Sequence, residues 1–128
     1  MEKETDKNTY VLQEDESIGT VKIADDVVAM IAGLAATEVE GVSAMAGTAG
    51  NEIMSKVGMK KIAKGVKVDV FEKHVTVDLA MMMDYGYNIP ATCQKVQTRV
   101  KTAIENMTGL QVSDVNIRIA GVNMQKGN

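Results

Sequence analysis

The clearest pattern in the chain is an alternation of apolar and polar residues, which is typical of a β-strand with one buried face. It occurs twice in close succession and is interrupted only around Glu72, Lys73 and His74. A connection this short cannot cross over a sheet, so the pattern predicts an antiparallel hairpin. The apolar positions are Val66, Val68 and Val70 in the first strand, and Val75, Val77, Leu79 and Met81 in the second.

A helical pattern follows between Asn88 and Gly109, with apolar residues at steps of three and four. Polar residues occupy the other faces, which predicts a helix that lies on a sheet with one side exposed. Asn88 can cap this helix, Pro90 is tolerated in its first turn, and Thr108 with Gly109 can end it. The apolar positions are Ile89, Cys93, Val96, Val100, Ala103, Ile104 and Met107.

An earlier helix is predicted after Asp25 and Asp26, whose carboxylates suit the N-terminus of a helix. Its apolar residues run almost all the way round, so either both faces are covered within the domain or one face meets a partner. We expect Gly41 to end this helix in the left-handed conformation. The main stripe is Val27, Met30, Ile31 and Leu34, and it is widened by Val28, Ala32 and Ala35.

Short alternating segments predict further strands at Thr20–Ile23, Val42–Met45 and Val115–Val122, and Tyr10–Leu12 could add an edge strand. The predicted order is strand, helix, short strand, glycine-rich connection, hairpin, helix, strand. This order favours an α/β fold: a two-layer domain whose mixed or mostly antiparallel sheet carries two main helices on one face.

The length of 128 residues suits one domain with one core. Acidic residues dominate the start of the chain, so residues 1–18 are interpreted as a mobile acidic N-terminal arm. Residues 19–122 would form the single α/β domain, and 123–128 a frayed C-terminal tail.

The connection from Gly47 to Gly65 is rich in glycine and has no regular pattern beyond a helical turn that Asn51–Val57 could form. The segment Lys56–Lys67 carries lysines with no acidic residue between them, and these could contact phosphates or an anionic membrane. A solvated loop is the alternative interpretation. The candidate anion-contact residues are Lys56, Lys60, Lys61 and Lys64.

Gly47 and Gly50 also form a GxxG pattern, which clamps the nucleotide backbone in KH domains when it joins two helices. Here the pattern follows a weak strand in a chain with eleven glycines, so a chance match is common. The net charge of −3 also argues against nucleic acid as a partner of the whole surface. Nucleic-acid or anionic-surface binding through Lys56–Lys67 is therefore the alternative hypothesis.

The composition indicates a cytoplasmic protein. There is one cysteine, the N-terminus lacks an apolar signal segment, and the longest uncharged apolar run, Val27–Thr37, is too short to cross a membrane. Membrane association would then be peripheral or through a partner. Ten methionines and only four aromatic residues predict an adaptable core.

No phosphate-loop, dinucleotide-binding, nucleophile-elbow or metal-binding motif is present, so the sequence predicts neither an enzyme nor a cofactor or metal site. His74 is expected to be a surface residue of the hairpin turn, and Cys93 a buried packing thiol. Asp69 and Asp78 lie on the polar phase of the paired strands. That face is either simply solvated or a surface for docking or dimerisation, with Thr76, Ala80 and Met82 beside the carboxylates.

Several motifs, taken together and in order between Gly19 and Val122, resemble the alkaline shock protein family, also called the Gls-type envelope stress response proteins of Gram-positive bacteria. They are Gly19-Thr-Val-Lys-Ile-Ala24, Ile31-Ala-Gly33, Thr37-Glu-Val-Glu-Gly-Val42, Gly65-Val-Lys-Val68, Tyr85-Gly-Tyr-Asn-Ile89, Val96-Gln97, Met107-Thr-Gly-Leu110 and the strand to Val122.

This resemblance implies a non-enzymatic adaptor in cell-envelope stress or homeostasis. It suggests as partner a membrane-anchored envelope protein or a subunit of acetyl-CoA carboxylase, with a link to fatty-acid synthesis. Separately, the extensive apolar surface of the first helix leaves a homo-oligomer open. Gly86 and Asn88 would form a bend and a cap, and Thr37 to Gly41 would end the first helix or present carboxylates to a partner. The candidate protein-contact residues are Glu38, Glu40, Asp78, Tyr85 and Tyr87.

Overall fold

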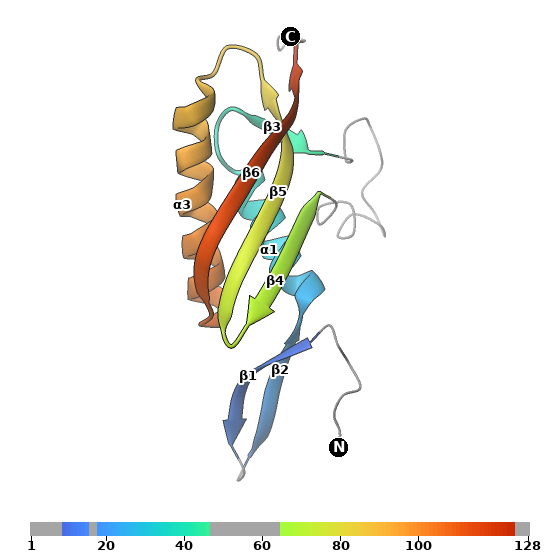
Figure 1. The fold of residues 1–128 in the computed structure, drawn as a ribbon, viewed down its shortest axis with the longest axis vertical. Coiled ribbons are helices and arrows are strands. Elements are labelled where there is room, and N and C mark those ends of the chain that lie inside the picture. The colour runs from blue at the N-terminus through green and yellow to red at the C-terminus, as the bar shows by residue number, and fades with distance from the viewer. Residues whose placement is uncertain (1–8, 16–17, 47–64, 125–128) are drawn as a thin grey trace.

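The computed structural model describes residues 9–15, 18–46 and 65–124, and these form two helices, a four-stranded sheet and a separate hairpin (Figure 1). The fold class and the order of elements are as predicted. The elements are β1 (Thr9–Asp15), β2 (Gly19–Ala24), α1 (Asp25–Thr37), β3 (Val42–Met45), β4 (Val66–Phe71), β5 (His74–Asp84), α3 (Ile89–Thr108) and β6 (Gln111–Asn123).

The long strand β5 organises the sheet. One edge of β5 pairs with β6 in parallel along its whole length, and its other edge is shared by β4 and β3, both antiparallel. The sheet is therefore mixed. The change of partner occurs at Ala80, whose amide donates to the carbonyl of Gly65 and whose carbonyl accepts from the amide of Ala46. Gly65 has a φ of +82°, and a Cβ there would lie 2.8 Å from the Ala46 carbonyl oxygen.

The predicted hairpin is formed by β4 and β5, and its turn is tighter than expected. Glu72 and Lys73 both have positive φ, 49° and 77°, which is the conformation of the two-residue turn that matches strand twist. His74 was expected in this turn, but it pairs with Phe71 as the first residue of β5.

Both helices lie on the same face of the sheet, and alternate residues of β5 point into the core between the layers. Val75, Val77, Leu79, Met81 and Met83 are all buried. They meet the apolar stripe of α3, which is buried as predicted at Val96, Val100 and Ile104. Methionine fills the end of the core near β3, where Met45, Met81 and Met83 are fully buried.

Helix α3 begins and ends as predicted. The Asn88 side chain accepts a hydrogen bond of 2.8 Å from the amide of Ala91, and Pro90 lies in the first turn. Gly109 adopts the left-handed conformation after the last turn, with φ of 80°. The Thr108 hydroxyl donates to the Ile104 carbonyl and accepts from the Leu110 amide, so it joins the helix to the start of β6.

Helix α1 differs from its prediction in two ways. It ends at Thr37 rather than at Gly41, because a turn closed by backbone hydrogen bonds from Glu38 and Val39 intervenes. Gly41, with φ of 104°, then leads into β3. The buried face also lies to one side of the predicted stripe, since Val27 and Leu34 remain exposed. The buried residues of α1 are Val28, Ala29, Ile31, Ala32, Gly33, Ala35 and Ala36.

The strands β1 and β2 form an antiparallel hairpin that extends beyond one end of the four-stranded sheet (Figure 1). The edge strand considered at Tyr10–Leu12 lies within β1. Part of the segment expected to be a mobile arm is thus regular strand. The helical turn considered at Asn51–Val57 lies outside the described residues.

Candidate protein-interaction site

The face of the sheet opposite the helices is not covered by any described element, and it is a candidate contact surface (Figure 1). Its residues are the alternate positions of β4, β5 and β6 that point away from the core. They are Lys67, Asp69 and Phe71, then Thr76, Asp78, Ala80 and Met82, then Asp114, Asn116, Arg118 and Gly121. We call these residues the open face.

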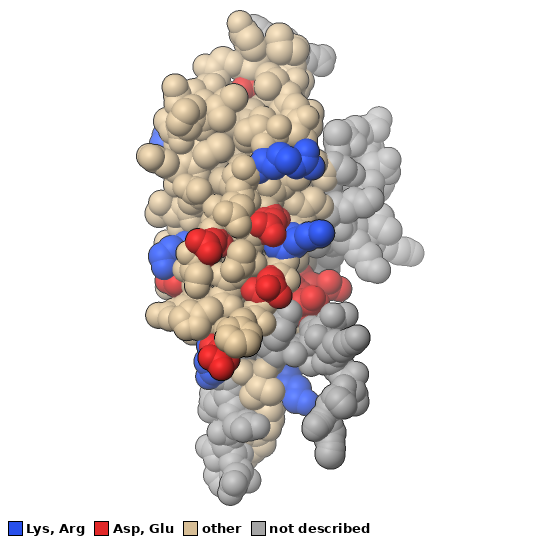
Figure 2. Space-filling model, viewed as in Figure 1, with Lys and Arg blue, Asp and Glu red and all other residues tan. Residues whose placement is uncertain are grey.

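Charge is unevenly distributed over the open face. Figure 2 shows acidic and basic side chains mixed over its middle and lower part, below a broad surface that is largely without charge. The strand register explains this gradient. Asp69 and Asp114 flank Thr76 at one level, Arg118 stands two residues beyond Asn116 along β6, and Met82 pairs with Gly121 beyond it.

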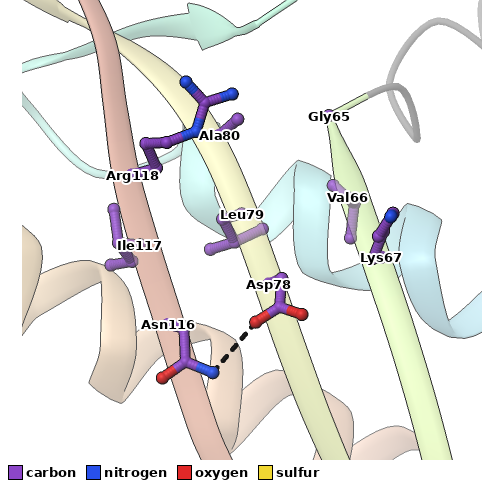
Figure 3. A pocket seen from close by; sticks show the side chains of 9 residues that line it. All are labelled: Gly65, Val66, Lys67, Asp78, Leu79, Ala80, Asn116, Ile117 and Arg118. Atoms are coloured by element: carbon purple, nitrogen blue, oxygen red, sulfur yellow. Dashed lines mark hydrogen bonds between the residues drawn. The ribbon is translucent and has the colours of Figure 1, made fainter.

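The middle of the open face forms a shallow hollow of about 620 Å³ (Figure 3). Asn116 donates a hydrogen bond of 2.9 Å to the Asp78 carboxylate at one end of this hollow. Lys67 from β4 and Arg118 from β6 border it on either side of β5. The hollow thus combines one oriented carboxylate with two cationic side chains, an arrangement suited to the polar groups and charges of a protein surface.

The residues at the upper end of the open face are apolar, and two of them are small. Ala80 and Met82 are half-buried, and a Cβ placed on Gly121 would lie 2.9 Å from the Met82 methyl carbon. The Met82 side chain therefore lies flat against the glycine. An adaptable methionine beside small residues leaves room for a partner's side chains, next to the charged hollow that would orient them.

A second cluster lies in the other layer, where α1 ends and α3 begins. The Tyr87 hydroxyl donates a hydrogen bond of 3.2 Å to the Glu40 carboxylate. This hydrogen bond, together with the negative charge of Glu40, raises the pKa of Tyr87 above its ordinary value. The Tyr87 ring covers Gly41, where an added Cβ would lie 2.9 Å from the ring. Tyr87 is thus held by packing and by its hydroxyl.

Glu38 belongs to the same region and forms a 3.2 Å ion pair with Arg99 of α3. Both side chains are more than half exposed, so the pair adds little stability. A groove of about 910 Å³ runs between this turn and the exposed face of α3. Lys95, Thr98 and Thr102 line the α3 side of the groove.

The structure divides the predicted contact residues between these two surfaces. Glu38, Glu40 and Tyr87 come together beside α3, whereas Asp78 lies on the open face. Tyr85 is 62% exposed beyond the end of β5, and its amide donates to the Asn123 carbonyl. Gly86, with φ of 101°, and Asn88 form the expected bend and cap. No single site contains all the predicted residues.

The predicted anion-contact residues Lys56, Lys60, Lys61 and Lys64 lie outside the described residues. Of the basic segment, the structure places Lys67, which stands across the strand from Asp78 and two positions from Asp69. These carboxylates oppose the binding of an anion at Lys67.

Cys93 is only half-buried on α3, although it packs against the core, and burial raises the pKa of its thiol. A raised pKa keeps the thiol protonated and poorly nucleophilic. His74 is exposed at the start of β5. Within residues 9–15, 18–46 and 65–124, no group of three or more His, Cys, Asp or Glu side chains could hold a metal ion.

Three residues of these surfaces were missed by sequence reasoning. Asn116 and Arg118 lie on the polar phase of β6, and this phase was visible in the sequence. Their position beside Asp78 depends on the parallel register of β5 and β6, which no local pattern specifies. Arg99 lies on a polar, exposed face of α3, and its pairing with Glu38 depends on how α3 lies beside the end of α1.

Comparison with known protein families gives a match over most of the chain. The model of the alkaline shock protein 23 family, described as having a cell envelope-related function, matches residues 13–124. The match covers most of the chain and includes both helices and every strand of the main sheet. The chain belongs to the alkaline shock protein family. This confirms the resemblance to Gls-type envelope stress proteins.

Curated relatives of this alkaline shock family protein come from Gram-positive bacteria. The uncharacterized protein YqhY of Bacillus subtilis (strain 168) is 37% identical over 109 residues, which cover 85% of this chain and 81% of YqhY. YloU of the same strain is 34% identical over 110 residues, covering 81% of this chain and 88% of YloU. A stress response regulator gls24 homolog of Streptococcus pyogenes is 29% identical over 105 residues, covering 81% of this chain and 59% of the homolog.

No solved structure matches the chain. Among the described residues, neither helix is both long enough and apolar enough to cross a membrane. Family membership therefore associates the protein with the cell envelope and with stress responses in Gram-positive bacteria.

Proposed function

We propose that this alkaline shock family protein is a non-enzymatic adaptor that acts from the cytoplasm in cell-envelope stress or homeostasis and binds its protein partner through the open face. The observation that carries this proposal is the one-sided cover of the sheet. Both helices pack on one face, and the opposite face combines the charged hollow around Asp78 with the apolar side chains of Ala80 and Met82.

The two halves of the open face supply what a protein contact needs. An apolar area loses water on binding and supplies most of the affinity, whereas bordering charges set orientation and exclude wrong partners. Asp78 is already oriented by Asn116, so less conformational freedom is lost when a partner pairs with it. We propose a membrane-anchored envelope protein, or a subunit of acetyl-CoA carboxylase with an effect on fatty-acid synthesis, as the partner.

Site-specific photocrosslinking in the cells that produce the protein tests the surface. A benzoylphenylalanine placed at Asn116 reports on the open face, and the same probe at Thr102 reports on the groove beside α3. We expect a discrete crosslinked product from Asn116 and not from Thr102. The reverse result would move the contact to the helical layer and overturn the assignment.

Charge reversal then tests the residues. Arg118→Glu and Asp78→Lys are expected to reduce the crosslink from Asn116 severalfold, with thermal unfolding unchanged because both side chains are exposed. Lys95→Glu is the matched control, since it makes the same change of charge on α3. Binding of purified acetyl-CoA carboxylase subunits, measured by biolayer interferometry with the same variants, distinguishes the two partner classes. A crosslink that disappears with nuclease treatment would contradict the adaptor proposal.

A further inference from the structure

The two outer edges of the sheet differ in whether other parts of the fold cover them. The edge formed by β6 is covered by side chains of α3: Gln97 donates to the carbonyl of Val115, and the Glu105 carboxylate accepts from the amide of Val112. Covering an edge in this way prevents another strand from pairing with it. The other edge, formed by β4, has no such cover among the described residues.

The direction of the backbone groups along β4 follows from Ala80. The amide and carbonyl of Ala80 point to the side of β5 on which β4 and β3 lie. Backbone groups of every second residue in a strand point to the same side, so those of Asp78 and Thr76 point there as well. Their partners Lys67 and Asp69 therefore hydrogen-bond to β5, and the amides and carbonyls of the intervening valines point outward. Within the part of the chain that the structure describes, Val66, Val68 and Val70 have no partner strand on that side.

The sequence of β4 is self-complementary about its centre. It reads Val66-Lys67-Val68-Asp69-Val70, with valines at symmetric positions and opposite charges on either side of Val68. We propose that a second copy of this chain pairs with β4 in antiparallel fashion about Val68, so that two sheets join edge to edge. Lys67 of each chain then stands opposite Asp69 of the other.

This register agrees with the backbone directions. A two-fold axis at Val68 places outward-pointing residues opposite one another in hydrogen-bonded pairs, Val66 with Val70 and Val68 with itself. Lys67 and Asp69 fall in the intervening non-hydrogen-bonded pairs, where side chains approach most closely. Two other registers also place outward-pointing residues opposite one another. A two-fold axis at Lys67 would set the two Lys67 side chains opposite each other, and an axis at Asp69 would do the same with the two Asp69 side chains. Within the described residues, neither Lys67 nor Asp69 has an ion-pair partner in its own chain.

The same register places Phe71 opposite Gly65 of the second copy. Phe71 is 71% exposed on the open face, and Gly65 has no side chain to cover its backbone. An aromatic ring placed across a strand from an edge glycine shields that backbone, and such pairs stabilise designed sheets. The pairing thus gives a contact to the most exposed aromatic side chain of the hairpin.

Apolar surface next to the β4 edge would also be buried. The three valines of β4 are only half-buried although their side chains face α1. On α1, Val27 and Leu34 also remain exposed, outside the buried arc of the helix.

Sedimentation equilibrium of the full chain across the micromolar range tests the proposal. The wild type is expected to dimerise, and Lys67→Asp alone or Asp69→Lys alone is expected to raise the dimer dissociation constant at least about tenfold, because each sets two like-charge pairs in the interface. An equimolar mixture of the two variants is expected to recover a dimer, since every pair is then opposite in charge. The double variant, with both charges exchanged, is expected to dimerise like the wild type.

Two further variants separate the edge from the rest of the molecule. Val68→Pro removes an amide that points outward and that β5 does not use, so the monomer should keep its circular dichroism spectrum while the dimer is lost. Arg118→Glu changes a charge on the open face away from β4 and should leave the dimer unchanged. A wild type that stays monomeric, or single charge variants that dimerise normally, would overturn the proposal.

Discussion

Helices α1 and α3 pack side by side on the same sheet, yet they differ in their caps and in how well their apolar pattern matches their buried residues. Helix α3 is capped at both ends, by Asn88 and Gly109, and buries one apolar stripe. In α1 the position before the first residue is Ala24, which makes no side-chain cap, and the buried residues include Gly33 and four alanines. Its bulkier Val27 and Leu34 remain exposed.

The difference shows how far the apolar pattern of a helix can predict which of its residues are buried. Helix α3 buries a narrow apolar stripe and carries polar residues on its other faces, so its period and boundaries can be read from its sequence. Helix α1, which packs against the sheet and α3, buries a broad arc of mostly small residues, so its apolar pattern does not mark which face is buried. Its remaining apolar surface is more than these neighbours bury, which is consistent with the edge pairing inferred for β4.

Truncation of an apolar side chain should give the largest difference in stability loss between the two helices. Ile104→Ala in α3 removes a fully buried side chain and should destabilise the protein by about 2–5 kcal/mol. Leu34→Ala in α1 removes a side chain that is 42% exposed and should cost about 1 kcal/mol or less. Urea denaturation at one fixed protein concentration measures both. Equal losses of unfolding free energy in the two variants would show that Leu34 is covered in solution.

Substitution of the glycine after α1 should have the next largest effect. Gly41→Ala forces a Cβ into a positive-φ conformation and against the Tyr87 ring, with an expected loss of about 1–3 kcal/mol. Gly86→Ala is the matched control, because Gly86 has a similar φ of 101° but no atom within 4 Å of an added Cβ. The difference in unfolding free energy between the two variants isolates the contact with Tyr87. No difference would mean that the ring moves aside freely.

Removal of the α3 cap should cost less. Asn88→Ala leaves the amide of Ala91 without its acceptor and should lower stability by about 1 kcal/mol, measured by thermal unfolding. Asn88→Asp keeps an acceptor at the same place and should be nearly neutral. If the aspartate variant were as unstable as the alanine variant, Asn88 would act through its other contacts rather than through the cap.

The smallest expected effect depends on pH and concerns Glu105 near the end of α3. Hydrogen bonds from the Lys101 ammonium and from the Val112 amide hold the pKa of this carboxyl below its ordinary value. The fold therefore favours the ionised form, and this stabilisation is present above the ordinary carboxyl pKa and is lost as the pH falls through the lowered value.

Thermal unfolding of wild type and Glu105→Gln across this pH range tests the point. The wild type should have the higher melting temperature at neutral pH, and the difference should shrink as the solution becomes acidic. A difference that stays constant with pH would assign the effect to packing. Lys101→Met is the companion variant, because it removes the cation while Val112 still donates to the carboxylate.

Most of the fold was predictable because its signals are local. The alternation in β4 and β5 and the caps of α3 each involve residues a few positions apart, and the structure confirms them. The end of α1 was misplaced because two features compete there. Gly41 does adopt a positive φ, as a stop residue should, but the intervening turn ends the helix at Thr37 first.

The candidate surface was predictable only in part. The polar phase of β5 identified Asp78, whereas its hydrogen bond with Asn116 joins residues that are distant in sequence and depends on how β6 lies against β5. The same limit applies to Glu38 and Arg99. Residues that share a face of one element can be found from periodicity, but residues that meet across elements require the packing of the whole domain.

The meeting of Ala46, Gly65 and Ala80 has a consequence for how this chain can vary. Ala46 and Gly65 both hydrogen-bond to Ala80 of β5, and a Cβ at Gly65 would lie against the Ala46 carbonyl oxygen, so the two residues on either side of 47–64 meet at one point of the sheet. The number of residues between them is thereby separated from the registry of the sheet. In general the free-energy cost of closing a loop grows slowly, by about 0.6 kcal/mol for each doubling of its length. Insertions, deletions or a changed number of lysines can therefore accumulate at this position while the two layers of the domain stay as they are.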